Sequence, residues 1–374
     1  MIPFNRASFD GKELTYLAQA VLDGHTAGNG PFTRRAEAML RELHGSGSVL
    51  LTTSCTHALE LSARLLDLQP GDEVIVPAYT FVTTASAFAW NGARPVFADI
   101  DPVTMNIDID DAASLVSERT KAICVVHYAG VGAQPADFAA LAARHGIAMI
   151  EDNAHGLGAR YDDQMLGTFG AMSTLSFHET KNVTCGEGGA LVLNDPGLIE
   201  RAEILREKGT DRSRFLRGQV DKYTWVDLGS SWVLSDLLAG VLVGQLERFA
   251  EIQQARMRIW QRYASDLADW AAVSSVRLPV IPDTAEHPAH MFTLIFADGK
   301  VRDRYIQHMR DRNILAVFHY QDLAASQMAH RLGSIRHCPN AQAAADRLVR
   351  LPLFASMRDE ELQAVIAATL EFAP

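Results

Sequence analysis

The clearest indication of architecture lies in IAMIEDNAH, residues 147–155, which is followed by SFHETKN, residues 176–182, and by GEGG, residues 186–189. The first stretch is an apolar run of strand length that ends at Asp152. The second follows another short apolar run and places Lys181 just before the glycine-rich turn. A lysine at such a turn can be held inside a pocket, where burial favours loss of its proton and lets the amine attack a carbonyl.

A lysine near a turn is usually solvated, so Lys181 alone indicates little. Asp152, at the end of a buried strand upstream of it, changes the interpretation. Pyridoxal phosphate is held by a lysine as a Schiff base, and a carboxylate keeps its pyridine nitrogen protonated so that the ring accepts electrons. The two residues together therefore predict a pyridoxal phosphate site.

Strand-like runs alternate with helix-like segments over the first two-thirds of the chain. The runs predicted as strands are 48–53, 73–78, 94–100, 122–130, 147–152, 173–177 and 190–195. The segments predicted as helices are 56–68, 83–91, 136–145 and 199–208. Strands that are apolar on both faces and separated by helices are typical of a mostly parallel sheet covered on both sides. We therefore predict an α/β domain.

A smaller second domain is predicted in the last third. Apolar residues recur at helical spacing over 234–252, which predicts a long helix leading out of the first domain. After a proline-rich, polar connection, two further strands and two further helices are predicted, at 291–297, 314–320, 302–312 and 359–372. We assign 1–250 to the large domain and 251–374 to a smaller α+β domain.

The composition is that of an ordinary globular protein. The chain has 374 residues, of which 48% are hydrophobic and 21% charged, and a formal net charge of −11. This charge disfavours general binding to nucleic acids or anionic membranes. The start of the chain has no apolar signal core, and the most apolar helix-like run, 232–246, is interrupted by polar residues. We expect no membrane span and a cytoplasmic location.

The sequence has no motif typical of a metal site or of a nicotinamide-dinucleotide site. The four cysteines are scattered without paired short spacing, and no His/Asp/Glu cluster has the spacing of a metal site. Gly130-Val131-Gly132 is followed by Pro135 where a dinucleotide-binding motif needs its third glycine. We therefore expect no metal, and a dehydrogenase is disfavoured.

Three further features have both a functional and an ordinary interpretation. Residues 52–58, TTSCTHA, follow a strand and open a helix, which suits a phosphate, but Thr56 could equally be a plain N-cap. Phe81 could stack on a flat ring, although core packing is the commoner role. The segment 209–225 is rich in arginine and aromatic residues. It could be a solvated loop, yet its length and composition favour binding a phosphorylated, ring-bearing ligand.

Taken together, these motifs resemble those of the DegT/StrS-type sugar-nucleotide aminotransferases, which belong to the fold-type I group of pyridoxal phosphate enzymes. The similarity runs in order along nearly the whole chain, through TSCTHAL, PAYTFVTTA, IEDNAH, SFHETKN with GEGG, and GQVDKYTW followed by GSSWVLSD. Within the family, the branch that makes dTDP-4-amino-4,6-dideoxygalactose shares IPFN at the start, HYAG, FHETKN and AVFHY. The resemblance implies a seven-stranded, mostly parallel sheet flanked by helices, plus a smaller C-terminal α+β domain.

The resemblance also implies roles for the cofactor-binding residues. Lys181 would hold pyridoxal phosphate and then carry a proton between the substrate carbon and the cofactor. Asp152 would pair with the pyridinium nitrogen. The residues expected to contact the phosphate are Cys55, Thr56 and Ser176.

Three other residues are expected around the cofactor. Phe81 would cover one face of the ring. His155 stands where many relatives have Gln and would bond the ring hydroxyl. Ser231 stands where many relatives have Asn and would reach the cofactor phosphate of a partner subunit, because the family is dimeric with active sites at the interface.

The substrate would be gripped by residues from two segments. The 209–225 segment would cross to the neighbouring site, where Arg212, Arg217, Lys222 and Tyr223 would contact a nucleotide-sugar. His319 and Tyr320 from the small domain would approach the sugar. The implied reaction takes an amine from L-glutamate and gives it to C4 of a dTDP-linked 4-keto-6-deoxyhexose, with the galacto product favoured.

Two alternatives stay open within this interpretation. One is an aminotransferase acting at C3 of a nucleotide-linked keto sugar, and the other is a binding or regulatory protein that keeps the fold without catalysis. A sugar 3-dehydratase is disfavoured, because that family has histidine at the position of Lys181. The downstream pathway, whether lipopolysaccharide or another amino sugar product, does not follow from the sequence.

Overall fold

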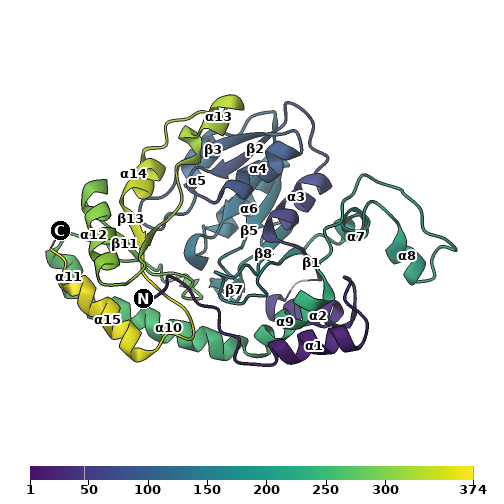
Figure 1. Cartoon of the computed structure of the whole chain (residues 1–374). Helices are drawn as coiled ribbons and strands as arrows, with labels where there is room; N and C mark the ends of the chain where they lie inside the picture. The colour runs from purple at the N-terminus through teal and green to yellow at the C-terminus, as the bar shows by residue number, and fades with distance from the viewer. Residues whose placement is uncertain (46, 374) are drawn as a thin grey trace.

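The computed structural model describes residues 1–45 and 47–373 and is built around one seven-stranded sheet (Figure 1). Its strand order is β1-β9-β8-β5-β4-β2-β3. The strands are β1 (Ser48–Thr52), β2 (Glu73–Pro77), β3 (Arg94–Ala98), β4 (Thr120–Val126), β5 (Ala148–Asp152), β8 (Met172–Ser176) and β9 (Gly189–Leu193). Each predicted strand of the first domain corresponds to one of these seven, so the predicted α/β sheet is confirmed.

Six strands run in the same direction and β9 runs against them. The β2–β3, β2–β4, β4–β5 and β5–β8 pairs are parallel, whereas β9 is antiparallel to both β8 and β1. The reversal follows from chain connectivity, because β8 and β9 are joined by the short connection 177–188 rather than by a crossover helix. Lys181 lies in this connection, and therefore at the carboxyl edge of the parallel strands.

Helices cover both faces of the sheet and extend from it at two sides (Figure 1). In chain order they are α1 (Glu13–Leu22), α2 (Pro31–His44), α3 (Cys55–Leu65), α4 (Val82–Trp90), α5 (Ile109–Ser114), α6 (Pro135–His145), α7 (Ile199–Arg206), α8 (Arg212–Leu216), α9 (Asp236–Glu247), α10 (Phe249–Asp266), α11 (Ala268–Val273), α12 (Gly299–Asp311), α13 (Gln327–Arg331), α14 (Pro339–Arg347) and α15 (Asp359–Leu370). The single long helix predicted over 234–252 is wrong in one respect: α9 and α10 are separate, and the chain turns at Arg248.

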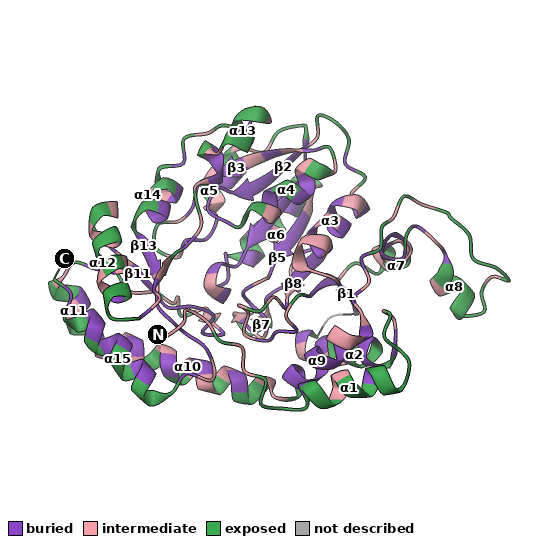
Figure 2. Ribbon diagram, viewed as in Figure 1, coloured by how far each residue is buried: buried purple, intermediate pink, exposed green. Residues whose placement is uncertain are grey.

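The strands of the sheet are buried along nearly their whole length (Figure 2). Successive side chains of a strand point to opposite faces, so both faces of the sheet are covered. On β2, Val74 and Val76 pack into one apolar cluster with α3 and α4, while Ile75 packs into another with α6. Apolar side chains of β1, β8 and β9 pack on the same side as α2 and α9 in a third cluster. Burial on both faces explains why the strand sequences are apolar throughout rather than alternating with polar residues.

The C-terminal part has its own small sheet and apolar core. Its strands, in the order β11-β13-β12, are β11 (Thr293–Ile295), β13 (Leu348–Arg350) and β12 (Val317–Phe318), all antiparallel to their neighbours. The predicted strands 291–297 and 314–320 are therefore present but much shorter, and α14 and β13 were not predicted at all. Strands of two or three residues form where distant segments pair. An apolar run in the sequence does not show which residues of it will pair.

The boundary predicted at residue 250 stays a prediction. Helix α10 begins at Phe249 and continues across it. The N-terminus lies beside the C-terminal part (Figure 1), because Ile2 pairs with Ile314 and Arg6 bonds Glu361 at 2.8 Å. Three very short strands, β6 (Arg160–Tyr161), β7 (Gln164–Met165) and β10 (Ala285–Glu286), form another small sheet.

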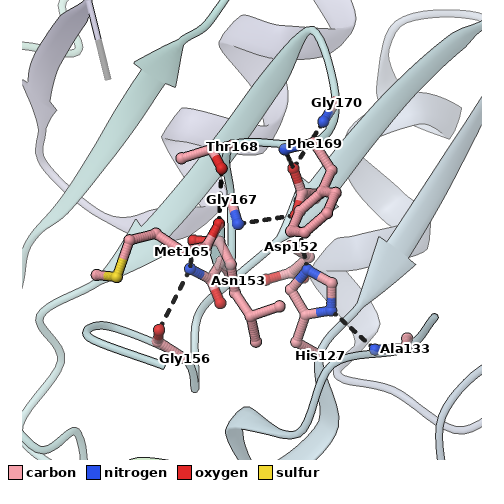
Figure 3. Close-up of polar contacts among 12 residues, drawn as sticks. His127, Ala133, Asp152, Asn153, Gly156, Met165, Gly167, Thr168, Phe169 and Gly170 are labelled. Carbon is pink, nitrogen blue, oxygen red and sulfur yellow. Dashed lines mark hydrogen bonds and ion pairs between the residues drawn. The ribbon is translucent and has the colours of Figure 1, made fainter. Parts of the chain in front are cut away.

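A buried carboxylate fixes the end of β5. Glu151 accepts hydrogen bonds from the amides of Gly167, Phe169 and Gly170 at 2.7–2.8 Å, and its other contact is His127 Nε2 at 2.9 Å. Figure 3 shows these amides and the histidine ring gathered beside Asp152. Burial alone would raise the pKa of Glu151, but the hydrogen bonds outweigh it and hold the pKa below its ordinary value. The network therefore anchors the strand from which Asp152 projects.

No helix in the described ranges, 1–45 and 47–373, is long and apolar enough to cross a membrane.

Candidate active site

A cavity of about 880 Å³ opens at the carboxyl edge of the large sheet. This is the edge where open α/β sheets bind ligands. Its walls come from the ends of the sheet strands, from the β8–β9 connection and from the C-terminal part. Nine of the predicted site residues line it: Cys55, Thr56, Phe81, Asp152, His155, Ser176, Lys181, His319 and Tyr320.

Asp152 is held rigidly at the floor of this cavity. Its Oδ2 accepts a hydrogen bond from Thr84 Oγ1 at 2.7 Å, and Oδ1 accepts from the amide of Ala154 at 3.3 Å. Burial raises the pKa of the Asp152 carboxyl above its ordinary value, and the charge of Lys181 opposes that rise. A cationic ring nitrogen placed against this carboxylate would stabilise its charged form and offset the effect of burial.

Thr84 is a site residue that sequence reasoning missed. It is buried in the first turn of α4, and its hydroxyl also lies 2.9 Å from that of Thr80. The only signal was the run of threonines in PAYTFVTTA, 77–85. A hydroxyl that fixes a carboxylate from a neighbouring element has no periodic signature in sequence.

Lys181 lines the same cavity and is close enough to Asp152 for the charge of each to shift the pKa of the other. Burial lowers the pKa of the Lys181 amine to about 8. The positive charge of Arg350 acts in the same direction, while Cys55 and Asp152 oppose it. A substantial fraction of the amine is therefore neutral near neutral pH, which suits a nucleophile; its catalytic role stays a prediction.

The start of α3 offers hydrogen-bond donors for an anion. The N-cap is Ser54, whose Oγ accepts from the His57 amide at 3.1 Å. The alternative in which Thr56 is a plain N-cap is therefore wrong, because Thr56 is already the second residue of the helix. The amides of Cys55 and Thr56 occupy the first two helical positions, which have no partner within a helix. With the helix dipole, they suit a phosphate dianion.

Close packing brings β9 against this helix start. A Cβ added to Gly189 would lie 2.4 Å from the Cys55 amide nitrogen, so only glycine fits there. Gly189 pairs with both Thr52 and Ser176 across the sheet, which sets Ser176 beside the start of α3. Burial raises the pKa of the Cys55 thiol to about 12, so the thiol stays neutral next to an anion.

Phe81 is not a core residue. It is the N-cap residue of α4 and is 55% exposed, although it lines the cavity. This exposure disfavours the core-packing interpretation and leaves a ring face available to a flat ligand. Its centroid is 6.3 Å from that of Tyr320.

His155 is fixed in one tautomer by its neighbours. Its Nδ1 accepts from the Ala129 amide at 3.3 Å, and its Nε2 lies 3.1 Å from the Tyr320 hydroxyl. Burial lowers the pKa of His155 well below its ordinary value, so the ring is neutral. A neutral ring that accepts at Nδ1 donates from Nε2. In this structure that donor meets Tyr320; the bond predicted to the cofactor's hydroxyl stays a prediction.

His319 and Tyr320 reach the cavity from the C-terminal part. His319 Nδ1 is 2.7 Å from the Tyr128 hydroxyl, which holds the histidine against the large sheet. Burial lowers the pKa of His319 well below its ordinary value. The rings of His155 and His290 are stacked, with their centroids 4.4 Å apart. With His319 and Tyr320 they form an uncharged aromatic wall.

The remaining five predicted residues lie away from this cavity. The segment 209–225, called the arm below, projects from the body and is largely exposed (Figures 1 and 2). It was predicted as a loop, but it contains the short helix α8. Arg212 pairs with Glu207 at 3.2 Å and Arg217 with Glu203 at 2.8 Å. Among the residues that the structure describes, five predicted ones do not line the cavity: Ser231, Arg212, Arg217, Lys222 and Tyr223.

Comparison with known proteins assigns this architecture to a family. Residues 9–370 match the DegT/DnrJ/EryC1/StrS aminotransferase family. The chain belongs to that family. The match covers nearly the whole chain, so the protein is a sugar aminotransferase of this family; that its active site is the cavity with Asp152 and Lys181 stays a prediction.

Individual proteins and solved structures are similar to this aminotransferase over most of their length. It is 30% identical over 347 residues to the uncharacterized protein MJ1066 of Methanocaldococcus jannaschii, covering 91% of this chain and 89% of that one. Among solved structures, the aminotransferase TlmJ from Streptoalloteichus hindustanus is 31% identical with a TM-score of 0.90, covering 98% and 97% of the two chains. The sugar aminotransferase CalS13 from Micromonospora echinospora is 26% identical with a TM-score of 0.89, covering 98% and 99%.

The cofactor is pyridoxal 5′-phosphate. A further similar structure, Spr1654 from Streptococcus pneumoniae, is 27% identical with a TM-score of 0.91 over 98% and 97% of the chains and was solved in its PLP-form. The residues present fit this group: a buried carboxylate for the ring nitrogen, a buried lysine, a partly exposed phenylalanine, and free amides at a helix start. The assignment of each residue to its part of the cofactor stays a prediction.

The lowered pKa of Lys181 predicts how cofactor attachment depends on pH. Below pH 8 the amine is protonated and cannot attack, so attachment of pyridoxal phosphate to the apoenzyme should accelerate as pH rises and level off above about 8. Stopped-flow absorbance of apoenzyme mixed with cofactor measures this, with N-acetyl-lysine in the same buffers as reference. A midpoint near that of an ordinary lysine would contradict the buried environment described here.

Proposed function

We propose that this aminotransferase moves an amino group from L-glutamate to C4 of a dTDP-linked 4-keto-6-deoxyhexose, giving a dTDP-4-amino-4,6-dideoxyhexose with the galacto product favoured. The family and the sugar aminotransferases among its structural relatives support the sugar class. The observation that carries the proposal is the placement of Asp152 and Lys181 in one cavity large enough for a cofactor and a sugar.

The cavity residues divide the chemical work. Bound pyridoxal phosphate supplies the ring that takes up the amino group from one substrate and passes it to the other. Asp152, fixed by Thr84, keeps the ring nitrogen protonated. The Lys181 amine, neutral above pH 8, removes a proton from the carbon that carries the amine and returns it on the other side of the transfer.

The walls of the cavity orient the substrates and limit water. His155, His290 and His319 have pKa values held far below the ordinary range by burial, so they add no charge near the reacting carbon. They offer hydrogen-bond donors and acceptors to a sugar instead. A wall of neutral rings suits a hydroxyl-bearing hexose better than a charged amino acid side chain.

Amination at C3 remains the second candidate position. The carbon that reacts is set by how the hexose lies against the cofactor, which one or two side chains such as His319 and Tyr320 can change. The C4 position is supported by the resemblance to the branch that shares HYAG, FHETKN and AVFHY.

We also propose a homodimer in which the arm completes the neighbouring active site. The arm carries exposed Phe215, Leu216, Tyr223 and Trp225 together with several cations, and it lies away from the cavity of its own chain. The guanidinium side of each pair is exposed, and ion pairs with an exposed partner are weak enough to give way to a phosphate. Exposed Ser231 would likewise serve the partner's cofactor phosphate.

Product analysis tests the reaction. Purified enzyme incubated with L-glutamate and dTDP-4-keto-6-deoxyglucose should form 2-oxoglutarate and a sugar whose NMR spectrum shows nitrogen on C4. Lys181→Ala should form neither while staying folded, because it lacks the nucleophile. An amine on C3, or no aminated sugar at all, would contradict the C4 assignment.

Complementation between two defective variants tests the arm. A variant with Lys222→Ala and Tyr223→Ala should raise the KM for the sugar nucleotide by roughly tenfold or more, since it loses a cation and an aromatic contact. Co-expressed with Lys181→Ala, it should regain wild-type-like KM, because mixed dimers contain one site with an intact lysine and an intact arm. The control partner carries all three changes and should restore nothing. Equal behaviour of both mixtures would mean that the arm does not serve the neighbouring site.

A further inference from the structure

Asn182, the residue after Lys181, makes hydrogen bonds that fix which of its amide atoms is nitrogen and which is oxygen. Its Nδ2 donates to the carbonyl of Pro288 at 2.7 Å and to Gln253 Oε1 at 2.9 Å. A backbone carbonyl can only accept, so the atom that faces Pro288 is the amide nitrogen. The other atom, Oδ1, therefore faces His290 Nδ1 at 2.8 Å.

This contact fixes the tautomer of His290. An amide oxygen can only accept, so the proton of the neutral imidazole lies on Nδ1. Burial lowers the pKa of His290 well below its ordinary value, which keeps the ring neutral. Its Nε2 therefore carries a lone pair without a proton, and this nitrogen is a hydrogen-bond acceptor only.

The unprotonated nitrogen is available to a ligand in the active-site cavity. His290 lines that cavity. Among the residues that the structure describes, none forms a hydrogen bond with Nε2, yet this atom is not one of the fully buried polar atoms that lack a partner. The charge of Lys181 contributes to the lowered pKa of His290, so the two side chains lie within electrostatic reach of each other.

His290 is held in place from several sides. The buried guanidinium of Arg256, on α10, donates to the carbonyls of Ala289 and His290 at 3.2 and 2.6 Å. Ala289 has a φ of 47°, a backbone conformation that residues with a side chain rarely adopt. The imidazole stacks on that of His155, with centroids 4.4 Å apart. An acceptor held so firmly can discriminate between ligands, because it cannot turn away from one that offers no donor.

An acceptor near Lys181 treats the two substrates differently. The proposed keto sugar has a hydroxyl on C3, next to the carbon that receives the amine, and a hydroxyl can donate to Nε2. The amino acid has a carboxylate next to its reacting carbon, and an ionised carboxylate can only accept. The lone pair of His290 therefore favours the sugar and offers nothing to the carboxylate.

We propose that His290, held by Asn182 as a hydrogen-bond acceptor, binds the C3 hydroxyl of the keto sugar. This inference rests on the proposed function insofar as it takes amination at C4. It makes His290 a residue that selects sugars with a free hydroxyl beside the keto carbon, and it makes Asn182 the residue that positions it.

The second half-reaction of the holoenzyme tests the proposal with two sugars. Enzyme whose cofactor carries the amine is mixed with dTDP-4-keto-6-deoxyglucose or with the same sugar lacking its C3 hydroxyl, and kcat/KM is measured from the absorbance change. His290→Phe keeps a ring to stack on His155 but has no acceptor. We expect the preference for the hydroxyl-bearing sugar to be about 10- to 100-fold larger in wild type than in this variant.

The preference is a ratio of two rates, so a general loss of activity does not change it. His290→Leu should lose the preference as His290→Phe does, and thermal melting shows that each variant is folded. Asn182→Ala should lose it too, because the ring proton is then free to move to Nε2. A preference in His290→Phe equal to that of wild type would overturn the proposal, and a full preference in Asn182→Ala would overturn the positioning role.

His287→Phe is the matched control. His287 lies three residues before His290 and outside the cavity, where its ring centroid is 4.5 Å from that of Trp260. This variant should keep the wild-type preference. A loss of preference here as large as in His290→Phe would show that any change in this segment has the same effect, and would overturn the proposal.

The position of the amine in the wild-type product separates this inference from the proposed function. An amine on C4 together with equal preferences in wild type and His290→Phe would contradict the inference alone. An amine on C3 would contradict both, because C3 would then be the keto carbon and would carry no hydroxyl.

Discussion

The active site depends on two neighbouring carboxylates that leave the end of β5 in opposite directions. Successive side chains of a strand point to opposite faces, so Glu151 and Asp152 cannot share an environment. Glu151 accepts hydrogen bonds from the amides of Gly167, Phe169 and Gly170 and contacts His127, while Asp152 lines the cavity and is held by Thr84. The first carboxylate fixes the backbone, and the fixed backbone aims the second at the cofactor.

The sheet reversal at β9 supplies the other half of the site. Because β9 returns directly beside β8, their connection crosses the carboxyl edge and carries Lys181 over the cavity. Gly189, at the start of β9, packs against the start of α3 and brings the free amides of Cys55 and Thr56 to the same edge. One topological feature thus places a nucleophile and an anion site around Asp152. Arg350, from β13, lines the same cavity.

Much of this arrangement could be predicted from sequence, for identifiable reasons. Buried parallel strands are continuous apolar runs, so all seven strands of the sheet could be predicted. The carboxyl ends of parallel strands lie at one edge of such a sheet. Asp152 and Lys181 were predicted to share one site from their places after apolar, strand-like runs, whereas Ser176 followed only from the family resemblance. Features that depend on contacts between distant segments were not predictable. Thr84 holds a carboxylate 68 positions away, and α14 and β13 have no distinctive pattern.

The central claim is that Asp152 and Lys181 hold one pyridoxal phosphate from two ends, and the most direct test identifies the lysine that carries it. Holoenzyme is reduced with sodium borohydride, digested and mapped by mass spectrometry. We expect a phosphopyridoxyl group on Lys181 in wild type, and its absence from Lys181→Ala. The group on any other lysine, or no stable adduct at all, would contradict the assignment of Lys181.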